Sequence, residues 1–157
     1  MNKIRPKPLI VALAIPLAVG GLAAFLIRDD VALFSSLNQP PLSPPSWLFP
    51  VVWTILYLLM GLASYLVYTS SAPQEQIRAA LLPYGVSLVF NFLWPVLFFR
   101  FQLYGLALVD LLALWVLILV TLRRYLPVSR TAANLLYPYL LWTTFAGYLN
   151  LGFLLLN

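Results

Sequence analysis

The sequence predicts an all-α integral membrane protein, a single domain built as a bundle of five transmembrane helices. Of its 157 residues, 63% are hydrophobic and 8% are charged, and the mean hydropathy is +0.95. A soluble domain carries about a quarter charged residues. A helical span takes ~20 apolar residues, so five spans occupy ~100 positions and leave room for short loops only. The chain has no histidine and no cysteine, which excludes catalysis by either side chain and a disulfide scaffold.

Charged and polar residues divide the chain into five apolar segments. We expect spans at residues 9–27, 46–68, 79–99, 101–122 and 133–155. The proline-rich stretch that includes Pro44 and Pro45 cannot continue a helix but can start one, so it predicts a loop before the second span. The polar segment 69–78 predicts a second loop.

The first span has an alternative interpretation. Lys3, Arg5 and Lys7 precede an apolar run that contains Gly20 and Gly21, a pattern that resembles a signal peptide. The apolar run continues to Ile27, longer than the apolar region of a typical signal peptide. We therefore expect a retained signal anchor.

The basic residues predict the orientation. Seven of the nine fall on the side of the N-terminus if five spans are present: Lys3, Arg5, Lys7, Arg78, Arg123, Arg124 and Arg130. Arg28 and Arg100 fall on the other side. The positive-inside rule then places the N-terminus in the cytoplasm and the C-terminus outside. Because these residues lie at the ends of apolar runs and not along one helical face, the net charge of +5 does not indicate nucleic-acid binding.

Two spans carry polar and aromatic stripes at helical spacing. Trp53 and Tyr57 lie four residues apart and deep enough for lipid to leave their polar atoms without partners, so we expect both to face the bundle interior. One stripe of the fifth span carries an aromatic ring, a small side chain and an amide, supplied by Trp142, Ala146 and Asn150. Interfacial anchoring and small-residue helix packing remain alternatives for these two stripes.

Asn91 and Asp110 are polar residues within otherwise apolar spans. Asn91 lies on a stripe with Pro83, Ser87 and Pro95, where it either joins helices by hydrogen bonds or contacts a ligand. An ionised carboxylate at mid-membrane costs at least ~2.5 kcal/mol. The spans hold no other acid and no histidine to extend a proton relay from Asp110, so we expect a structural carboxyl group, hydrogen-bonded across helices.

Five ordered motifs make the chain resemble the translocator protein family, also called tryptophan-rich sensory proteins or peripheral-type benzodiazepine receptors. They are Pro16-x3-Gly20, Pro44-Pro45-x-Trp47-x-Phe49-Pro50-x2-Trp53-x3-Tyr57, Phe90-Asn91-x2-Trp94, Ala107-x2-Asp110, and Pro138-Tyr139-x2-Trp142 through Leu149-Asn150. The resemblance is to a bacterial-type member and implies a homodimer in the bacterial cell membrane, surrounded by lipid.

The resemblance also implies a ligand pocket among the helices beneath the first loop. Its walls would be Trp53, Tyr57, Asn91, Trp94, Leu111, Trp115, Trp142 and Ala146, and Phe34 and Pro44 would form a lid. We expect Trp53 and Trp142 to form opposite walls. The first loop departs from the family pattern, because Leu33, Phe34 and Leu42 stand where tryptophan or tyrosine is usual.

The leading functional hypothesis is a receptor or sensor for porphyrin-type tetrapyrroles, with sterols or benzodiazepine-like molecules as further ligands and no required cofactor. The rings would stack on tryptophan faces, and a propionate could pair with Arg28. Histidine and cysteine, the usual axial ligands of haem iron, are absent, which favours metal-free or weakly ligated tetrapyrroles. Transport and tryptophan-dependent porphyrin breakdown remain alternatives, although no internal repeat supports transport.

Overall fold

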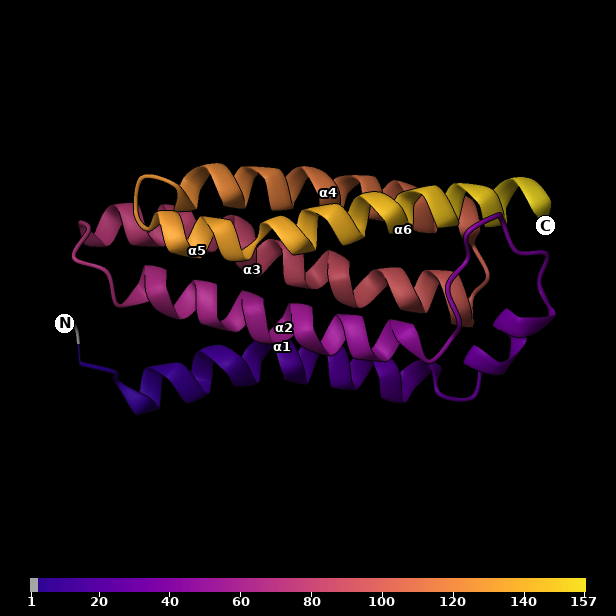
Figure 1. Ribbon diagram of the computed structural model, residues 1–157, viewed down its shortest axis with the longest axis horizontal. Helices are drawn as coiled ribbons and strands as arrows, with labels where there is room; N and C mark the ends of the chain where they lie inside the picture. The colour runs from indigo at the N-terminus through magenta and orange to yellow at the C-terminus, as the bar shows by residue number, and fades with distance from the viewer. Residues whose placement is uncertain (1–2) are drawn as a thin grey trace.

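The computed structural model describes residues 3–157 and confirms the all-α fold class. Five of its helical segments are long and apolar enough to cross a membrane. Figure 1 shows them packed side by side along one axis, with the N-terminus at one end of the bundle and the C-terminus at the other. Within the bundle, α1 contacts α2 and α3, and α4 contacts α3 and α6.

The elements follow one another in chain order as listed here: α1 (Pro6–Ile27), the 3₁₀ helix η1 (Val31–Ser36), α2 (Leu48–Tyr68), α3 (Gln74–Pro95), the π-helical turn η2 (Val96–Arg100), α4 (Tyr104–Tyr125), α5 (Arg130–Leu135) and α6 (Tyr137–Leu156). The third span is therefore α3 with η2, and the fifth is α5 with α6.

Most helices begin or end two to five residues from the expected bounds, and three of the differences have a clear local reason. The helix α3 begins at Gln74, ahead of the apolar run, because Pro73 can precede a helix and Glu75 suits its first turn. Before α4 the chain breaks at Gln102, whose φ of 53° is left-handed. The fifth span is divided at Leu136 because Pro138 has no backbone N–H and clashes with the carbonyl group four residues earlier.

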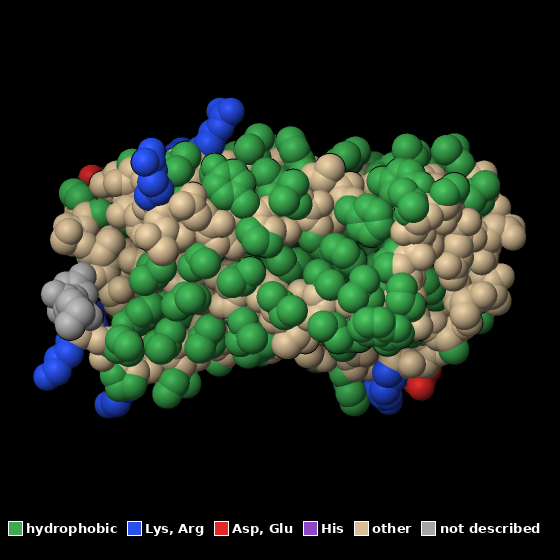
Figure 2. All heavy atoms as spheres, in the orientation of Figure 1, with side chains coloured by type: hydrophobic (Ala, Val, Ile, Leu, Met, Phe, Trp, Pro, Cys, Tyr) green, Lys and Arg blue, Asp and Glu red, His purple; other side chains and the backbone are tan. Residues whose placement is uncertain are grey.

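The surface has an apolar belt between two charged ends. Figure 2 shows hydrophobic side chains over the middle of the visible face and Lys and Arg side chains near both ends. Large side chains that lipid would cover, such as Val109 and Leu141, are exposed on the outside of α4 and α6. This arrangement suits a hydrocarbon core of ~30 Å between two polar interfaces.

We predict that the end of the bundle holding the N-terminus faces the cytoplasm. The seven basic residues named above belong to that end and its connections, and Arg28 and Arg100 belong to the other. Reporter fusions at both termini will measure this: a cytoplasmic reporter should be active at the N-terminus and inactive after Asn157. Cytoplasmic activity after Asn157 would contradict the orientation.

The segment between α1 and α2 folds across the end of the bundle that holds the C-terminus, which is called the outer end below, and hydrogen bonds attach it to α6. Asn38 and Asn157 exchange hydrogen bonds, with the Asn38 backbone N–H donating to the Asn157 amide oxygen at 3.0 Å. The Tyr148 hydroxyl donates to the Pro41 carbonyl at 2.7 Å. A Cβ on Gly152 would come within 2.5 Å of Pro40, so this contact requires glycine. The loop is therefore held at several points along one helix.

Candidate ligand-binding cavity

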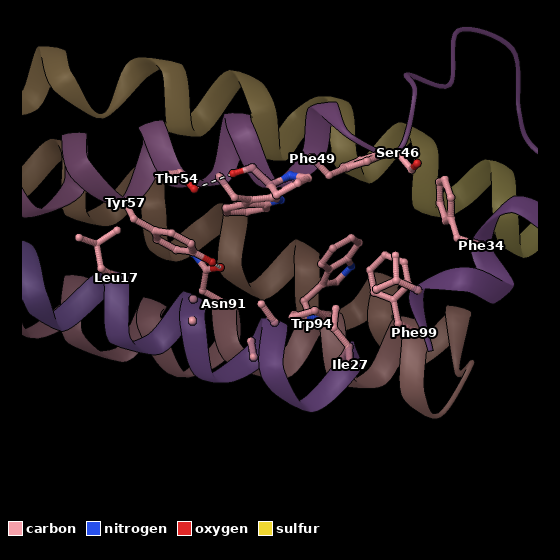
Figure 3. A pocket seen from close by; sticks show the side chains of 18 of the residues that line it. Leu17, Ile27, Phe34, Ser46, Phe49, Thr54, Tyr57, Asn91, Trp94 and Phe99 are labelled. Carbon is pink, nitrogen blue, oxygen red and sulfur yellow. Dashed lines mark hydrogen bonds between the residues drawn. The ribbon is translucent and has the colours of Figure 1, made fainter. Parts of the chain in front are cut away.

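A cavity of about 480 Å³ lies between α1, α2 and α3 in the outer half of the bundle. Figure 3 shows Leu17 and Ile27 of α1 on one side and Thr54 and Tyr57 of α2 on the other. Ligand pockets typically measure ~300–1,000 Å³ and are predominantly apolar with a few fixed polar groups. This cavity meets that description, since most of its lining residues are apolar or aromatic.

Half of the predicted site residues line this cavity: Phe34, Trp53, Tyr57, Asn91 and Trp94. The other five lie elsewhere. Leu111 and Ala146 are buried in the helix core, and Pro44 is half-buried in the first loop. The Trp115 indole N–H donates to the Thr144 hydroxyl at 2.8 Å, away from the cavity.

Trp142 lies behind the cavity wall. Its ring meets Phe49 edge to face, with 5.9 Å between centroids, and Phe49 itself lines the cavity. The outer side of Trp142 contributes to a shallow groove between α2 and α6, together with residues such as Ile55 and Leu141. The structure therefore does not place Trp53 and Trp142 on opposite walls of one cavity.

Asn91 joins three helices at the inner end of the cavity. The Tyr57 hydroxyl of α2 donates to the Asn91 amide oxygen at 3.3 Å, and the Asn91 amide nitrogen donates to the Tyr139 hydroxyl of α6 at 2.6 Å. Asn91 also belongs to the cavity lining. The two interpretations left open by the sequence, a helix-joining amide and a ligand contact, are thus compatible at one residue.

Aromatic rings form the rigid part of the wall. Trp53 stacks on Tyr57 at 5.7 Å and meets Tyr139 edge to face at 6.4 Å. Trp94 is 8% exposed, and its indole N–H donates to the Asn150 amide oxygen at 2.9 Å. Neighbouring side chains hold these rings in place. A ligand can therefore stack on them without first ordering them, which lowers the entropic cost of binding.

Phe34 closes the outer end of the cavity. It is 5% exposed and contacts the rings of Phe49, Phe99 and Phe153, whose centroids lie 5.6, 5.9 and 5.0 Å away. The tryptophan or tyrosine expected from the family pattern near this position would carry a polar atom. Phenylalanine instead makes an entirely apolar plug that needs no hydrogen-bond partner.

The wall formed by α1 was not predicted from the sequence. It consists of small and aliphatic residues: Leu17, Gly20, Gly21, Ala23, Ala24 and Ile27. A Cβ on Gly20 would lie 2.1 Å from the Tyr57 ring, so glycine allows that ring to pack against α1. The motif Pro16-x3-Gly20 was the sequence signal for this wall. It was not interpreted in that way because Gly20 and Gly21 also fit the pattern of a signal peptide.

Asp110 lies outside the cavity, on the buried face of α4. It is 6% exposed, and its Oδ2 atom has no hydrogen-bond partner among residues 3–157. The expectation that this carboxyl group is hydrogen-bonded across helices is therefore wrong for Oδ2. An unpartnered oxygen makes the ionised form more costly at this depth.

We predict that Asp110→Asn folds and binds ligand as well as the parent. The amide is nearly isosteric and carries no charge to bury, so its thermal midpoint should equal or exceed that of the parent. Thermal unfolding and porphyrin titration in detergent or vesicles will measure both properties. Lost binding in a folded Asp110→Asn protein would instead assign a recognition or proton-transfer role to the carboxyl group.

These features define an integral membrane protein with five membrane-spanning segments and an aromatic cavity between the helices. The chain belongs to the TspO/MBR family, whose model matches residues 12–156. It is 35% identical to the tryptophan-rich protein TspO of Chlorobaculum tepidum over 100% of this chain and 99% of that protein. It is 36% identical to the tryptophan-rich sensory protein of Cereibacter sphaeroides, covering 84% of this chain and 80% of that protein. It is 40% identical to the translocator protein of Bos taurus, covering 74% and 70%.

Family membership supports a role as a membrane sensor or receptor. The match includes the cavity-lining part of α1, the whole of α2 and α3, the first loop and α6. All ten site residues predicted from the family resemblance lie within the matched range.

Proposed function

We propose that the protein is a membrane sensor that binds a flat, predominantly apolar tetrapyrrole of the porphyrin class in the cavity between α1, α2 and α3. The observation that carries this proposal is the pairing of fixed indole faces, Trp53 and Trp94, with a cavity of about 480 Å³. Aromatic faces bind flat conjugated rings by stacking, and apolar walls gain free energy by covering them.

The polar groups of the cavity suit the edge of such a ring. Asn91 provides an amide at the inner end. Arg28 follows α1 outside the cavity lining, where its side chain is 55% exposed and its guanidinium group lies 4.0 Å from the centre of the Phe25 ring. We propose that this exposed group turns to pair with a propionate at the edge of the ligand. The protein supplies no histidine or cysteine, so recognition depends on ring contact and peripheral polar groups, with no resident cofactor required.

The proposal includes a homodimer in a bacterial cell membrane, as the resemblance to bacterial-type members implies. Sterols and benzodiazepine-like molecules are further candidate ligands, because they too are predominantly apolar ring systems with a few polar groups, which suits a mostly apolar lining. Transport and light-driven porphyrin breakdown are distinct functions that use the same binding step, so the experiment must separate them.

Titration of vesicle-reconstituted protein with a free-base porphyrin tests the proposal. Tryptophan fluorescence should be quenched saturably, and the absorbance of the bound porphyrin should remain stable in darkness and in light. Light-dependent bleaching would favour breakdown, and porphyrin movement across the vesicle membrane would favour transport. Quenching that does not saturate would contradict a specific site.

A further inference from the structure

Both ends of the cavity are closed by packed side chains. At the outer end, Phe34 fills the space between Phe49 and Phe99, beneath a loop that is fastened to α6. At the inner end, the hydrogen-bonded group Tyr57, Asn91 and Tyr139 crosses the bundle from α2 to α6. A ligand entering along the bundle axis would have to break one of these two arrangements.

The side between α1 and α2 is different. The exposed residues that line the cavity belong to α1, α2 and the segment that joins them, and none belongs to α3. Gly21 and Ala24 of α1 and Pro50 and Thr54 of α2 are among them, between Leu17 toward the inner end and Trp47 toward the outer end. A residue that faces both the cavity and the surroundings marks an opening. Here the surroundings are the lipid-facing side of two transmembrane helices.

The three glycines along this side differ in the space around them. Nearer the cytoplasmic end α1 and α2 touch closely, since a Cβ on Gly61 would lie 2.7 Å from the Ala12 carbonyl oxygen. At Gly20 they still meet through the Tyr57 ring. One residue further on, a Cβ on Gly21 would have no atom within 4 Å, so α1 leaves open space beside the cavity at this point.

We propose that Gly21, Ala24, Pro50 and Thr54 frame a lateral portal through which the ligand enters the cavity from the bilayer. This inference rests on the proposed binding function and extends it by restricting the ligand class. The ligand would be a membrane-dissolved amphiphile, flat enough to pass between two helices. Arg28 lies seven residues beyond Gly21 on the same side of α1, where a carboxylate of the ligand could remain at the membrane interface.

Gly21→Leu tests the portal because a Cβ at this position meets no atom within 4 Å and the larger side chain extends into the opening. Gly85→Leu is the matched control: Gly85 is an exposed glycine of another spanning helix, a Cβ there also meets nothing within 4 Å, and it does not line the cavity. Both changes replace helical glycine by the same residue, so their effects on helix propensity are similar.

The measurement is the rate of tryptophan quenching after protein vesicles are mixed with vesicles that contain a free-base porphyrin, and the rate of recovery after excess empty vesicles are added. A blocked portal should slow association and dissociation, each by about tenfold or more, because the ligand crosses the same barrier in both directions. Gly21 also lines the cavity, so slower dissociation is the diagnostic result and the equilibrium Kd is not: a change confined to the ligand's seat would leave dissociation unchanged or make it faster. Gly85→Leu should match the parent.

Three results would overturn the portal. Unchanged rates in Gly21→Leu would mean that the ligand enters elsewhere. A weaker Kd caused by faster dissociation alone would place Gly21 in the seat of the ligand and not on its route. Equal slowing in Gly85→Leu would indicate a general effect on the protein. A parent protein that binds no porphyrin would instead contradict the proposed function itself.

A further variant tests the axial route. Tyr148→Phe removes the hydrogen bond that holds the first loop to α6 at Pro41. If the ligand enters laterally, loosening this loop should leave association rates within about twofold of the parent, since the loop is not on the route. Faster association in Tyr148→Phe would favour entry beneath the loop and overturn the lateral portal.

Discussion

Trp53→Ala is expected to weaken porphyrin binding by about 1–3 kcal/mol, a factor of about 5 to 150 in Kd, the range known for base–aromatic stacking. The indole of Trp53 is held by a stacking contact with Tyr57 and lines the cavity, so alanine removes a preoriented ring face. If stacking dominates, Trp53→Phe should retain most of the affinity. If the indole N–H anchors a ligand oxygen, Trp53→Phe should already lose about 1 kcal/mol or more.

Trp142→Ala provides the matched control for this prediction. Trp142 is the same residue type in a neighbouring helix, but Phe49 separates its ring from the cavity. Its loss should therefore weaken binding by much less than the loss of Trp53. Titrations monitored by porphyrin absorbance give both affinities, and thermal midpoints confirm that each variant is folded. A larger effect at Trp142 than at Trp53 would move the ligand away from the cavity.

Asn91→Leu is expected to destabilise the bundle by about 1–3 kcal/mol and to weaken ligand binding, because it leaves the hydroxyls of Tyr57 and Tyr139 without their present partner. An average interhelical hydrogen bond in a membrane contributes only ~0.6 kcal/mol, so a loss above 1 kcal/mol would reflect the two bonds together with the buried hydroxyl of Tyr139. Thermal or denaturant unfolding in detergent measures the change.

Ser87→Ala is the control for Asn91→Leu. Ser87 lies one turn earlier on α3 and is equally buried, but its hydroxyl donates to the Tyr84 carbonyl of the same helix. Ser87 also lies beside the Tyr139 hydroxyl of α6, but that hydroxyl keeps its 2.6 Å hydrogen bond from the Asn91 amide, so Ser87→Ala should cost less than Asn91→Leu. An Asn91→Leu protein that is as stable as Ser87→Ala, and that binds porphyrin with the parent's affinity, would show that the amide neither joins the helices nor supports the site.

The helices could be predicted from the sequence because apolar length and charge placement determine membrane spans directly. The inward positions of Trp53 and Asn91 also followed from local rules, since a polar atom deep in a span avoids lipid. By contrast, the division of the fifth span at Leu136 was not predicted, because a proline within a span does not always divide it: Pro16 and Pro83 lie inside continuous helices, whereas Pro138 lies at the start of a new one.

The site was only partly predictable from the sequence. Helical spacing shows which residues share a face of a helix, but not which neighbouring helix that face packs against. Trp142 lies on an inward stripe, yet it packs behind Phe49, since Phe49 and not Trp142 reaches the cavity from that side. The contribution of α1 was hidden for another reason: Gly20 and Gly21 act through the space they leave, and glycine in an apolar run has several meanings. The roles of such glycines become clear only from the three-dimensional packing around them.

A crystal structure of the protein with a palladium porphyrin tests the central claim most directly, because the anomalous signal of the metal locates the ring without reference to the protein model. We expect one strong peak per chain inside the cavity, between α1 and α2 and within stacking distance of the Trp53 ring. A peak confined to the groove between α2 and α6 beside Trp142, or to the outer surface of the bundle, would contradict it.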